Sequence, residues 1–429
     1  MWSQSLIGTI WSSKWSAVWL ATSRLIGYAA PALVVNWLTT QGEYYLQLAL
    51  LTTIGSACIL LGSRISLFGN FSPAGFGCIS IRLDSFLIIA WLSFCTFAIV
   101  AWTTASKIPI VSSFQCFDAE QISVHRELFL KARMGWESGL VYINGLLMGA
   151  IIPYALALMF VHNTRFRWLC LTFFLVYSVS FLEKAFFLKA LLPAVYLLFQ
   201  GRIKTKGASI GLPLSIIVLL LLLTYTASGL CSASTSSSID ITQTAPEKTT
   251  QLIDSSNKDS NAPTAFNPNY MTAGYQPSGT VDHLVWRAIA VPLFTAKDAL
   301  KVFHEHFDSQ PLLGATSTLL AAMFNRERVP YERIVFERQW GQNKTATGSA
   351  NSVYVTEAFV NFGLFGVIII SLLIGQMLRW FAVSTDIAFQ SLWPILALDL
   401  YVSGFSGVTL SNGFALIFLI ALLVRWRTA

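Results

Sequence analysis

Ten apolar segments alternate with polar ones along the chain. They occupy residues 16–39, 43–62, 84–106, 138–161, 166–182, 185–200, 210–229, 352–379, 383–403 and 408–425. Most come close to the roughly 20 residues that an α-helix needs to cross a bilayer. The shorter runs near 166–200 fit either two spans or one hairpin of short or tilted helices. The pattern predicts an all-α polytopic membrane protein with about ten transmembrane helices.

Composition agrees with a membrane location. The 429-residue chain is 55% hydrophobic and only 11% charged, whereas a soluble domain carries roughly 25% charged residues. The first residues, MWSQSLIGTIWSSKW, do not have the charged, apolar and small-residue regions of a secretory signal peptide. We therefore expect the first apolar segment to direct insertion.

The distribution of basic residues predicts the orientation of the spans. With a cytoplasmic N-terminus, the inner segments carry these cations: Lys14, Arg64, Arg82, Arg165, Arg167, Arg202, Lys204, Lys206, Arg379, Arg425 and Arg427. Asp84 and Asp386 are the acidic residues that oppose them. Because cytoplasmic loops carry an excess of Lys and Arg, ten spans place both termini in the cytoplasm.

The spans divide the chain into five regions. We expect N-terminal transmembrane helices at 1–106, a first outer loop at 107–137, central transmembrane helices at 138–229, a large outer loop at 230–351 and C-terminal transmembrane helices at 352–429. Residues 231–269, rich in Ser, Thr, Asp and Pro, predict a flexible segment. Further on, Leu300, Phe303 and Phe307 form the apolar stripe of an amphipathic helix.

The outer loops contain many cations, against the usual bias. They are Arg126, Lys131, Arg133, Arg287, Lys297, Lys301, Arg326, Arg328, Arg333 and Arg338. Arginine offers a fork of donors suited to phosphate oxygens, so the set predicts binding of a lipid pyrophosphate or an anionic polysaccharide. Alternatively, these cations are solvated and pair with Glu127, Glu137, Glu327, Glu332 and Glu337. Of the arginines, Arg287 and Arg338 have the surroundings best suited to phosphate contact.

Tyr354, Glu357 and Asn361 are spaced to share one face of a helix at the outer end of a span. A carboxylate there is costly unless it lines a cavity or is paired. Glu357 is therefore either a general base for a sugar hydroxyl or half of a structural Glu–Arg pair. His304 is a second acid/base or phosphate-binding candidate, and no third ligand near His304 and His306 indicates a metal.

Charged residues and cysteines elsewhere leave alternatives open. Arg24 and Asp399 lie inside predicted spans and either pair with each other or line a path for a lipid headgroup. Lys189, also in a span, requires a polar cavity or a carboxylate partner. Cys116 and Cys231 fall in the two outer loops, where they form either a disulfide or two free thiols.

Three stretches resemble the bacterial Wzy-type oligosaccharide repeat-unit polymerases, which make O-antigen and exopolysaccharide. The stretches are RMGWESGLVYINGLLMGAIIPYAL, EKAFFLKALLPAVYLLFQGR, and WRAIAVPLF through TATGSANSVYVTEAFVNFGLFG. They cover roughly the middle and last third of the chain. The Arg-x10-Gly pattern of some members is not met, because Gly348 follows Arg338 one position early and Gly145 follows Arg133 one position late.

The resemblance implies a GT-C-like glycosyltransferase that needs no metal or other cofactor. It would act at the periplasmic face of the bacterial inner membrane, on oligosaccharides linked to undecaprenyl diphosphate. Arg287, with Arg338 and Arg133, would stabilise the departing pyrophosphate, while Glu357 or His304 takes the proton. The expected substrate-binding residues are Arg126, Arg133, Lys301, Arg328, Lys344, Asn351, Tyr354 and Asn361.

Two other functions fit the same sequence features. An O-antigen ligase would use a similar donor with a lipid A-core acceptor, and a flippase or transporter would carry more charges deep in its spans. Expected partners are the lipid-linked oligosaccharide and membrane lipids, with a chain-length regulator and a flippase as candidate proteins. Nothing in the sequence indicates nucleic-acid binding.

Overall fold

The computed structural model describes residues 8–39, 43–66, 79–115, 119–131, 133–182, 184–203, 282, 285–340, 348–350 and 352–427. In these residues, five helices are long and apolar enough to cross a membrane: Ser13–Leu38, Tyr44–Arg64, Leu83–Thr104, Gly135–Val161 and Tyr354–Val383. Shorter apolar helices are Arg167–Ser180, Phe186–Phe199, Ile387–Val402 and Phe414–Leu423. These apolar helices confirm the predicted class, an all-α membrane protein. The predicted span at 210–229 lies outside the described residues.

The first part of the chain contains η1 (Ser13–Trp15), α2 (Ser16–Arg24), η2 (Leu25–Ala29), α3 (Ala30–Leu38), α4 (Glu43–Arg64), β1 (Ile79–Arg82), α5 (Leu83–Thr104), α6 (Pro109–Phe114), α7 (Ala119–Leu130), η3 (Gly135–Gly139), α8 (Leu140–Leu146), η4 (Leu147–Ile151), α9 (Ile152–Val161), α10 (Arg167–Ser180) and α11 (Lys184–Phe199). The second part contains η5 (Trp286–Ala290), α15 (Val291–His306), α16 (Thr318–Met323), α17 (Tyr331–Trp340), α18 (Tyr354–Val383), α19 (Ile387–Gln390), α20 (Trp393–Val402), η6 (Gly407–Ser411), α21 (Phe414–Leu423) and β2 (Val424–Arg427).

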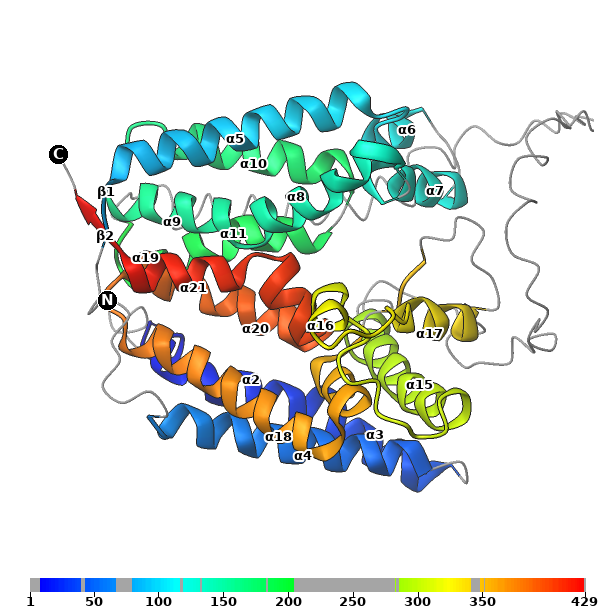
Figure 1. The fold of residues 1–429 in the computed structure, drawn as a ribbon. Coiled ribbons are helices and arrows are strands. Elements are labelled where there is room, and N and C mark those ends of the chain that lie inside the picture. The colour runs from blue at the N-terminus through cyan, green and yellow to red at the C-terminus, as the bar shows by residue number, and fades with distance from the viewer. Residues whose placement is uncertain are drawn as a thin grey trace, which may run out of the picture.

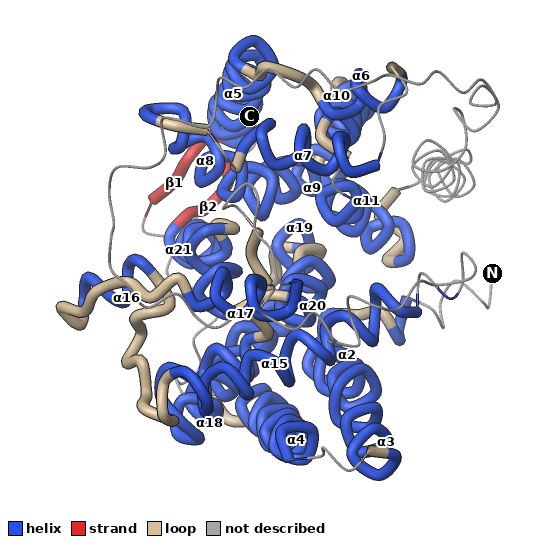
Figure 2. The backbone as a smooth tube through the Cα atoms, turned by 90° about the vertical axis from the view of Figure 1, so that its right-hand side faces the viewer, coloured by secondary structure: helices blue, strands red, loops and turns tan. Residues whose placement is uncertain are grey.

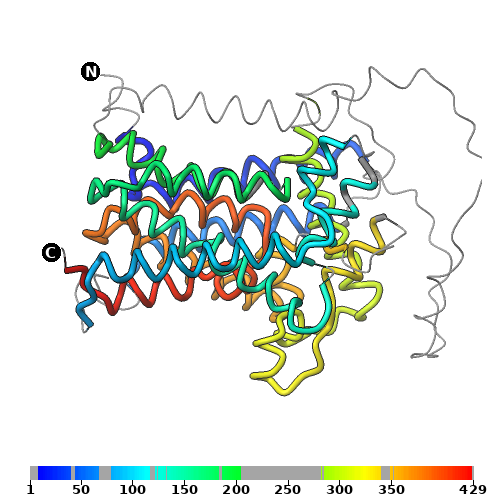
Figure 3. The backbone as a smooth tube through the Cα atoms, turned by 90° about the horizontal axis from the view of Figure 1, so that it is seen from above, coloured from blue at the N-terminus to red at the C-terminus, as the bar shows by residue number. Residues whose placement is uncertain are grey.

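The long helices lie side by side, and the two predicted outer loops meet at one end of the bundle. In Figure 1, α6 and α7 from the first loop and α15, α16 and α17 from the second lie at the end opposite to β1 and β2. Figure 3 shows the same separation from above. At the other end, β1 and β2 pair in parallel, with Ile79 opposite Val424. The two loops therefore build one common face.

Glycines allow α4 and α18 to pack closely along their length. A Cβ on Gly375 would lie 2.4 Å from the Ile59 carbonyl oxygen, and one on Gly62 would lie 2.4 Å from that of Leu372. Gln376 donates from the same region of α18 to the Gly62 carbonyl. Small residues that let two backbones approach are the usual means of helix association in membranes. This contact fixes α18 as part of the scaffold.

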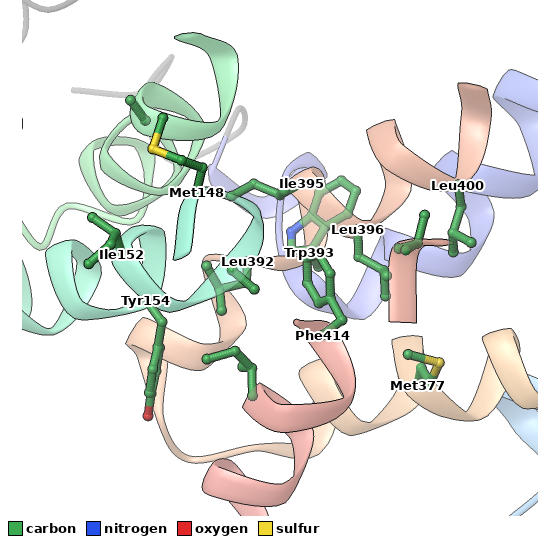
Figure 4. Packing of buried hydrophobic residues seen from close by; sticks show 14 of the residues in the cluster. Met148, Ile152, Tyr154, Met377, Leu392, Trp393, Ile395, Leu396, Leu400 and Phe414 are labelled. Atoms are coloured by element: carbon green, nitrogen blue, oxygen red, sulfur yellow. The ribbon is translucent and has the colours of Figure 1, made fainter. Parts of the chain in front are cut away.

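Helix α20 occupies the middle of the bundle, between α18 and the group formed by α9 and α11. Figure 2, viewed along the bundle, places α20 behind the outer helices α15 and α17. Leu396 and Trp393 of α20 lie against Phe414 in Figure 4, and Ile395 extends toward Met148. All of these side chains belong to one buried apolar cluster. The predicted span 383–403 is divided into α19 and α20, because Pro394 occupies the first turn of a new helix.

Three π-helical turns each precede a proline by two residues. Pro31 follows η2, Pro153 follows η4 and Pro292 follows η5. Proline has no N–H, and its ring collides with the carbonyl four residues earlier, so a wider turn before it relieves the collision. The carbonyl freed in η5 belongs to Ala288, and it accepts a hydrogen bond from the Tyr401 hydroxyl at 3.2 Å.

Of the buried charges inside the bundle, Lys189 has a predicted type of partner and Arg24 does not. Asp399 accepts from Lys189 at 2.7 Å and from the Asn412 side chain at 2.9 Å, which confirms a carboxylate partner for Lys189. Arg24 instead donates to the Leu400 carbonyl at 2.8 Å, and its guanidinium lies 4.0 Å from the centre of the Tyr354 ring. The expected Arg24–Asp399 pair is therefore wrong.

Candidate functional site

A cavity of about 680 Å³ opens at the outer end of the bundle. Its described lining comes from α8, α16, α17, α18, η6 and the loops beside them: Tyr142, Ile143, Leu146, Thr316, Ser317, Thr318, Leu319, Ala322, Arg328, Tyr331, Glu332, Ser352, Glu357, Ser406, Gly407, Leu410 and Ser411. Two of the predicted site residues, Glu357 and Arg328, are part of this lining.

Glu357 is buried in the first turns of α18 and is fixed on both carboxylate oxygens. The Ser406 hydroxyl donates to its Oε1, and the Ser406 backbone N–H donates to its Oε2 at 3.3 Å. A Cβ on Gly404 would lie 2.6 Å from Oε2, so only glycine leaves room for the carboxylate. The expected arginine partner is absent among the ion pairs of the described residues.

Asn361 joins α18 to the loop that forms one wall of the cavity. Its side chain donates to Thr316 Oγ1 at 2.8 Å and accepts from the Gly314 N–H at 2.9 Å. Gly363 interrupts α18 with φ +64°, a conformation that glycine adopts readily. This break frees the carbonyls of residues 360 and 361, which accept from the N–H groups of residues 312 and 313 at 3.0 and 2.9 Å. The wall is therefore tied to α18 by four hydrogen bonds.

Glu332 is a cavity residue that the sequence reasoning assigned only to a surface ion pair. Glu332 is an exposed residue that lines the cavity. Its Oε2 accepts a hydrogen bond from Ser349 at 3.1 Å. Burial, and then the negative charge of Glu357, raise the pKa of Glu332 to about 7. The local ion pair of this helix lies elsewhere, between Arg333 and Glu337 at 2.7 Å.

The helical periodicity of α17 was the signal that could have revealed Glu332. Tyr331, Val335 and Gln339 are buried at four-residue spacing, and Glu332 is next to this stripe. Arg333 and Glu337 lie on another face and pair across one turn. The alternating charges of the sequence therefore do not show that Glu332 lines the cavity while Arg333 and Glu337 form a surface ion pair.

Arg328 is the cation in the described lining of the cavity. It is exposed, and its positive charge acts on Glu332, where it lowers the pKa against the larger effect of burial. The same lining includes the apolar side chains of Ile143, Leu146, Leu319 and Leu410 and the ring of Tyr142. The cavity thus combines polar groups, suited to hydroxyls and an anion, with apolar groups suited to hydrocarbon.

Tyr354 and Arg133, predicted to bind substrate, lie in the scaffold. The Tyr354 ring is buried beneath Arg24, and its hydroxyl is 3.3 Å from Ser371 Oγ. Arg133 donates to the Ala101 carbonyl at 2.9 Å, to the Thr104 hydroxyl and to the Phe129 carbonyl at 2.6 Å. A cation at the Ala101 carbonyl stabilises the end of α5, and at the Phe129 carbonyl the end of α7.

Three further predicted residues lie on the outer helices α15 and α17, away from the described cavity lining. His304 uses both ring nitrogens, with Ser309 Oγ at 2.7 Å and Gln47 Oε1 at 3.0 Å. Arg338 and Lys301 both reach Glu305, at 3.1 and 3.7 Å. These contacts join the outer helices to each other and to α4.

Arg287 and Arg126 form a second basic locus, outside the described cavity lining. Both residues keep exposed surface. Burial of part of the Arg287 side chain, and then repulsion from the positive charge of Arg126, lower the pKa of Arg287. Tyr401 holds the π-turn that carries Arg287, through its bond to Ala288. Like charges brought together in this way favour binding of an anion between them.

Lys344 and Asn351 lie outside the described residues. Within the residues placed by the structure, no group of three His, Cys, Asp or Glu side chains is arranged to hold a metal ion. Comparisons with protein-family models, with curated proteins and with solved structures gave no match.

Proposed function

We propose that this protein is an integral membrane glycosyltransferase that polymerises oligosaccharide repeat units linked to undecaprenyl diphosphate. The growing lipid-linked glycan is the donor, and a sugar hydroxyl of the incoming unit is the acceptor. The observation that carries this proposal is the cavity that Glu357, Glu332 and Arg328 line together with apolar side chains. A lipid-linked sugar likewise combines a polar and a hydrocarbon part.

The charged groups support the proposed chemistry. Glycosyl transfer from a diphosphate needs a carboxylate that takes a proton and cations that stabilise the leaving anion. The cavity supplies the carboxylates and Arg328, and Arg287 with Arg126 supplies a second anion site at the same end of the bundle. Neither carboxylate of the cavity has a cationic partner within ion-pair distance among the described residues.

The proposal includes a location and a topology. The chain lies in the bacterial inner membrane as a GT-C-like bundle of about ten transmembrane helices, with the family resemblance to Wzy-type polymerases as its basis. Both termini are cytoplasmic, and the cavity faces the periplasm. A chain-length regulator and a flippase are its proposed protein partners, and the reaction needs no metal.

Glycan length in a strain that lacks the protein tests the function. We expect single repeat units on the cell surface, with full-length glycan restored by the wild-type chain. The variants Glu357→Ala and Arg328→Ala should be produced and inserted normally but extend glycan at least about tenfold more slowly, since each removes a charged contact. Glu327→Gln, an exposed neighbour outside the described lining, is the matched control.

Other outcomes identify the alternatives. Loss of all transfer to lipid A would indicate an O-antigen ligase, and accumulation of inward-facing precursor would indicate a flippase. Normal glycan length in the deletion strain would reject all three activities.

A further inference from the structure

We infer that Glu332, and not Glu357, accepts the proton of the attacking sugar hydroxyl, and that Glu357 is a positioning residue that acts through Glu332. This inference rests on the proposed function and deepens it. It assigns a catalytic role to a residue of the outer loop, and it separates the roles of two carboxylates that line one cavity.

Glu357 is poorly placed to receive a proton from a substrate. Both of its oxygens already accept hydrogen bonds from Ser406, one from the hydroxyl and one from the backbone. Its side chain is 8% exposed and packs against Gly404. A carboxyl group held in this way has a fixed position in the cavity wall, which suits a positioning role.

Glu332 is better placed to receive this proton. Its residue keeps more accessible surface than Glu357 in the same cavity. Its carboxylate accepts hydrogen bonds from the Ser349 hydroxyl, at 3.1 Å on Oε2, and from the backbone N–H of Ser352. The Ala350 N–H donates to the Glu332 carbonyl at 3.0 Å, which holds the segment at 348–350 beside α17. Because Glu332 is exposed and lines the cavity, a hydroxyl that enters the cavity can reach its carboxylate.

The charges around Glu332 adjust its affinity for a proton. Glu357 on α18 raises it, Arg328 in the loop before α17 lowers it, and burial raises it most. The tyrosines of the described lining are Tyr142 and Tyr331, and burial raises the pKa of Tyr331, which is neutral. A base with a pKa of about 7 is efficient near neutral pH, because it is substantially ionised and still holds a proton well.

In the proposed step, the acceptor O–H bond breaks and its proton goes to Glu332. The oxygen forms a bond to the anomeric carbon of the donor as the bond from that carbon to the diphosphate breaks. The electron pair of this bond leaves with the diphosphate, and Glu332 then releases its proton to solvent. The step needs no oxidant, reductant or further reactant.

Steady-state kinetics on purified protein in lipid nanodiscs, with a lipid-diphosphate-linked repeat unit as substrate, test the inference. We expect Glu332→Gln to lower kcat by roughly 10²- to 10⁴-fold with little change in KM. It should also abolish the rise of kcat with pH near 7, and Glu332→Asp should restore part of both. Glu357→Gln should move this rise to lower pH, because it removes a negative neighbour, an effect that a merely structural role would not produce.

Infrared titration of the carboxylic acid band gives a readout independent of turnover. The wild-type protein should show a group that titrates near pH 7, absent in Glu332→Gln and unchanged in Glu327→Gln. If the wild type extends glycan but Glu332→Gln keeps its kcat and pH profile, the inference is wrong and the proposed function stands. If the wild type extends no glycan, both fail together.

Discussion

Lys189 Nζ lies 2.7 Å from Asp399 Oδ2 and joins α11 to α20 inside the bundle, where both side chains are almost completely buried. Removal of one partner leaves an uncompensated charge, which costs about 3–5 kcal/mol, whereas replacement of both by apolar residues is often neutral. We expect Lys189→Met and Asp399→Leu each to lower the stability of the protein strongly. The double variant should recover most of the loss in a thermal unfolding assay in detergent.

A double variant without recovered stability would contradict this account of the Lys189–Asp399 pair. If the double variant is no more stable than either single variant, the Asn412 contact to Asp399, at 2.9 Å, dominates the local energy.

The ring of Tyr354 covers the guanidinium of Arg24, so we expect substitutions there to act on stability and not on substrate affinity. Tyr354→Phe keeps the ring and should leave KM unchanged. Tyr354→Ala leaves a cavity in a buried site and should cost about 3–5 kcal/mol of unfolding free energy. A raised KM in Tyr354→Phe, with normal stability, would instead support the predicted role of Tyr354 in substrate binding.

His304 bonds to Gln47 and Ser309 through its two ring nitrogens, and its ring stacks on Tyr44 at a centroid distance of 5.6 Å. We therefore expect His304→Ala to loosen α15 from α4 at a cost of about 1–3 kcal/mol, while turnover at low temperature stays normal. Thermal unfolding and initial rates on the same preparation separate the two effects. A loss of turnover with unchanged stability would support a catalytic histidine.

Gly404 leaves the space that the Glu357 carboxylate occupies. In Gly404→Ala the new Cβ would lie 2.6 Å from Oε2, so the carboxylate has to move. We expect glycan extension to fall by at least about tenfold, because a positioned charge is lost from the cavity, while the protein still inserts and folds. Gly139→Ala is the matched control, since a Cβ there meets nothing within 4 Å.

The raised pKa of Glu332 predicts how stability depends on pH. The pKa of this carboxyl group changes from 4.5 in its ordinary state to about 7 in the folded protein, so folding takes up a proton between these values. Its stabilising contribution is therefore complete below about pH 4.5 and is lost as the pH rises through about 7. The melting temperature of the wild type should fall over this range by more than that of Glu332→Gln, with Glu327→Gln as the control.

The sequence predicted the helices of this fold far better than the contacts of its site. Long apolar runs specify spans because the bilayer requires both their length and their hydrophobicity, and α4, α5 and α18 lie where those runs are. Helical spacing predicted one shared face for Tyr354, Glu357 and Asn361, and all three residues are buried in α18.

The partners of these side chains could not be predicted, because they come from distant parts of the chain. Tyr354 meets Arg24, Glu357 meets Ser406, and Asn361 meets Thr316, on three different elements. A charge pattern likewise gives no information about which of two adjacent residues, Glu332 or Arg333, turns toward a cavity. That choice depends on the angle at which α17 packs.

The break of α18 at Gly363 also sets an order of assembly. Gly314 donates to Asn361, which is 47 residues further along the chain, and the N–H groups of residues 312 and 313 likewise depend on carbonyls near Asn361. Because synthesis runs from the N-terminus, this loop is made before the residues that bond to it. The cavity wall can therefore take its final form only after the first turns of α18 have been made.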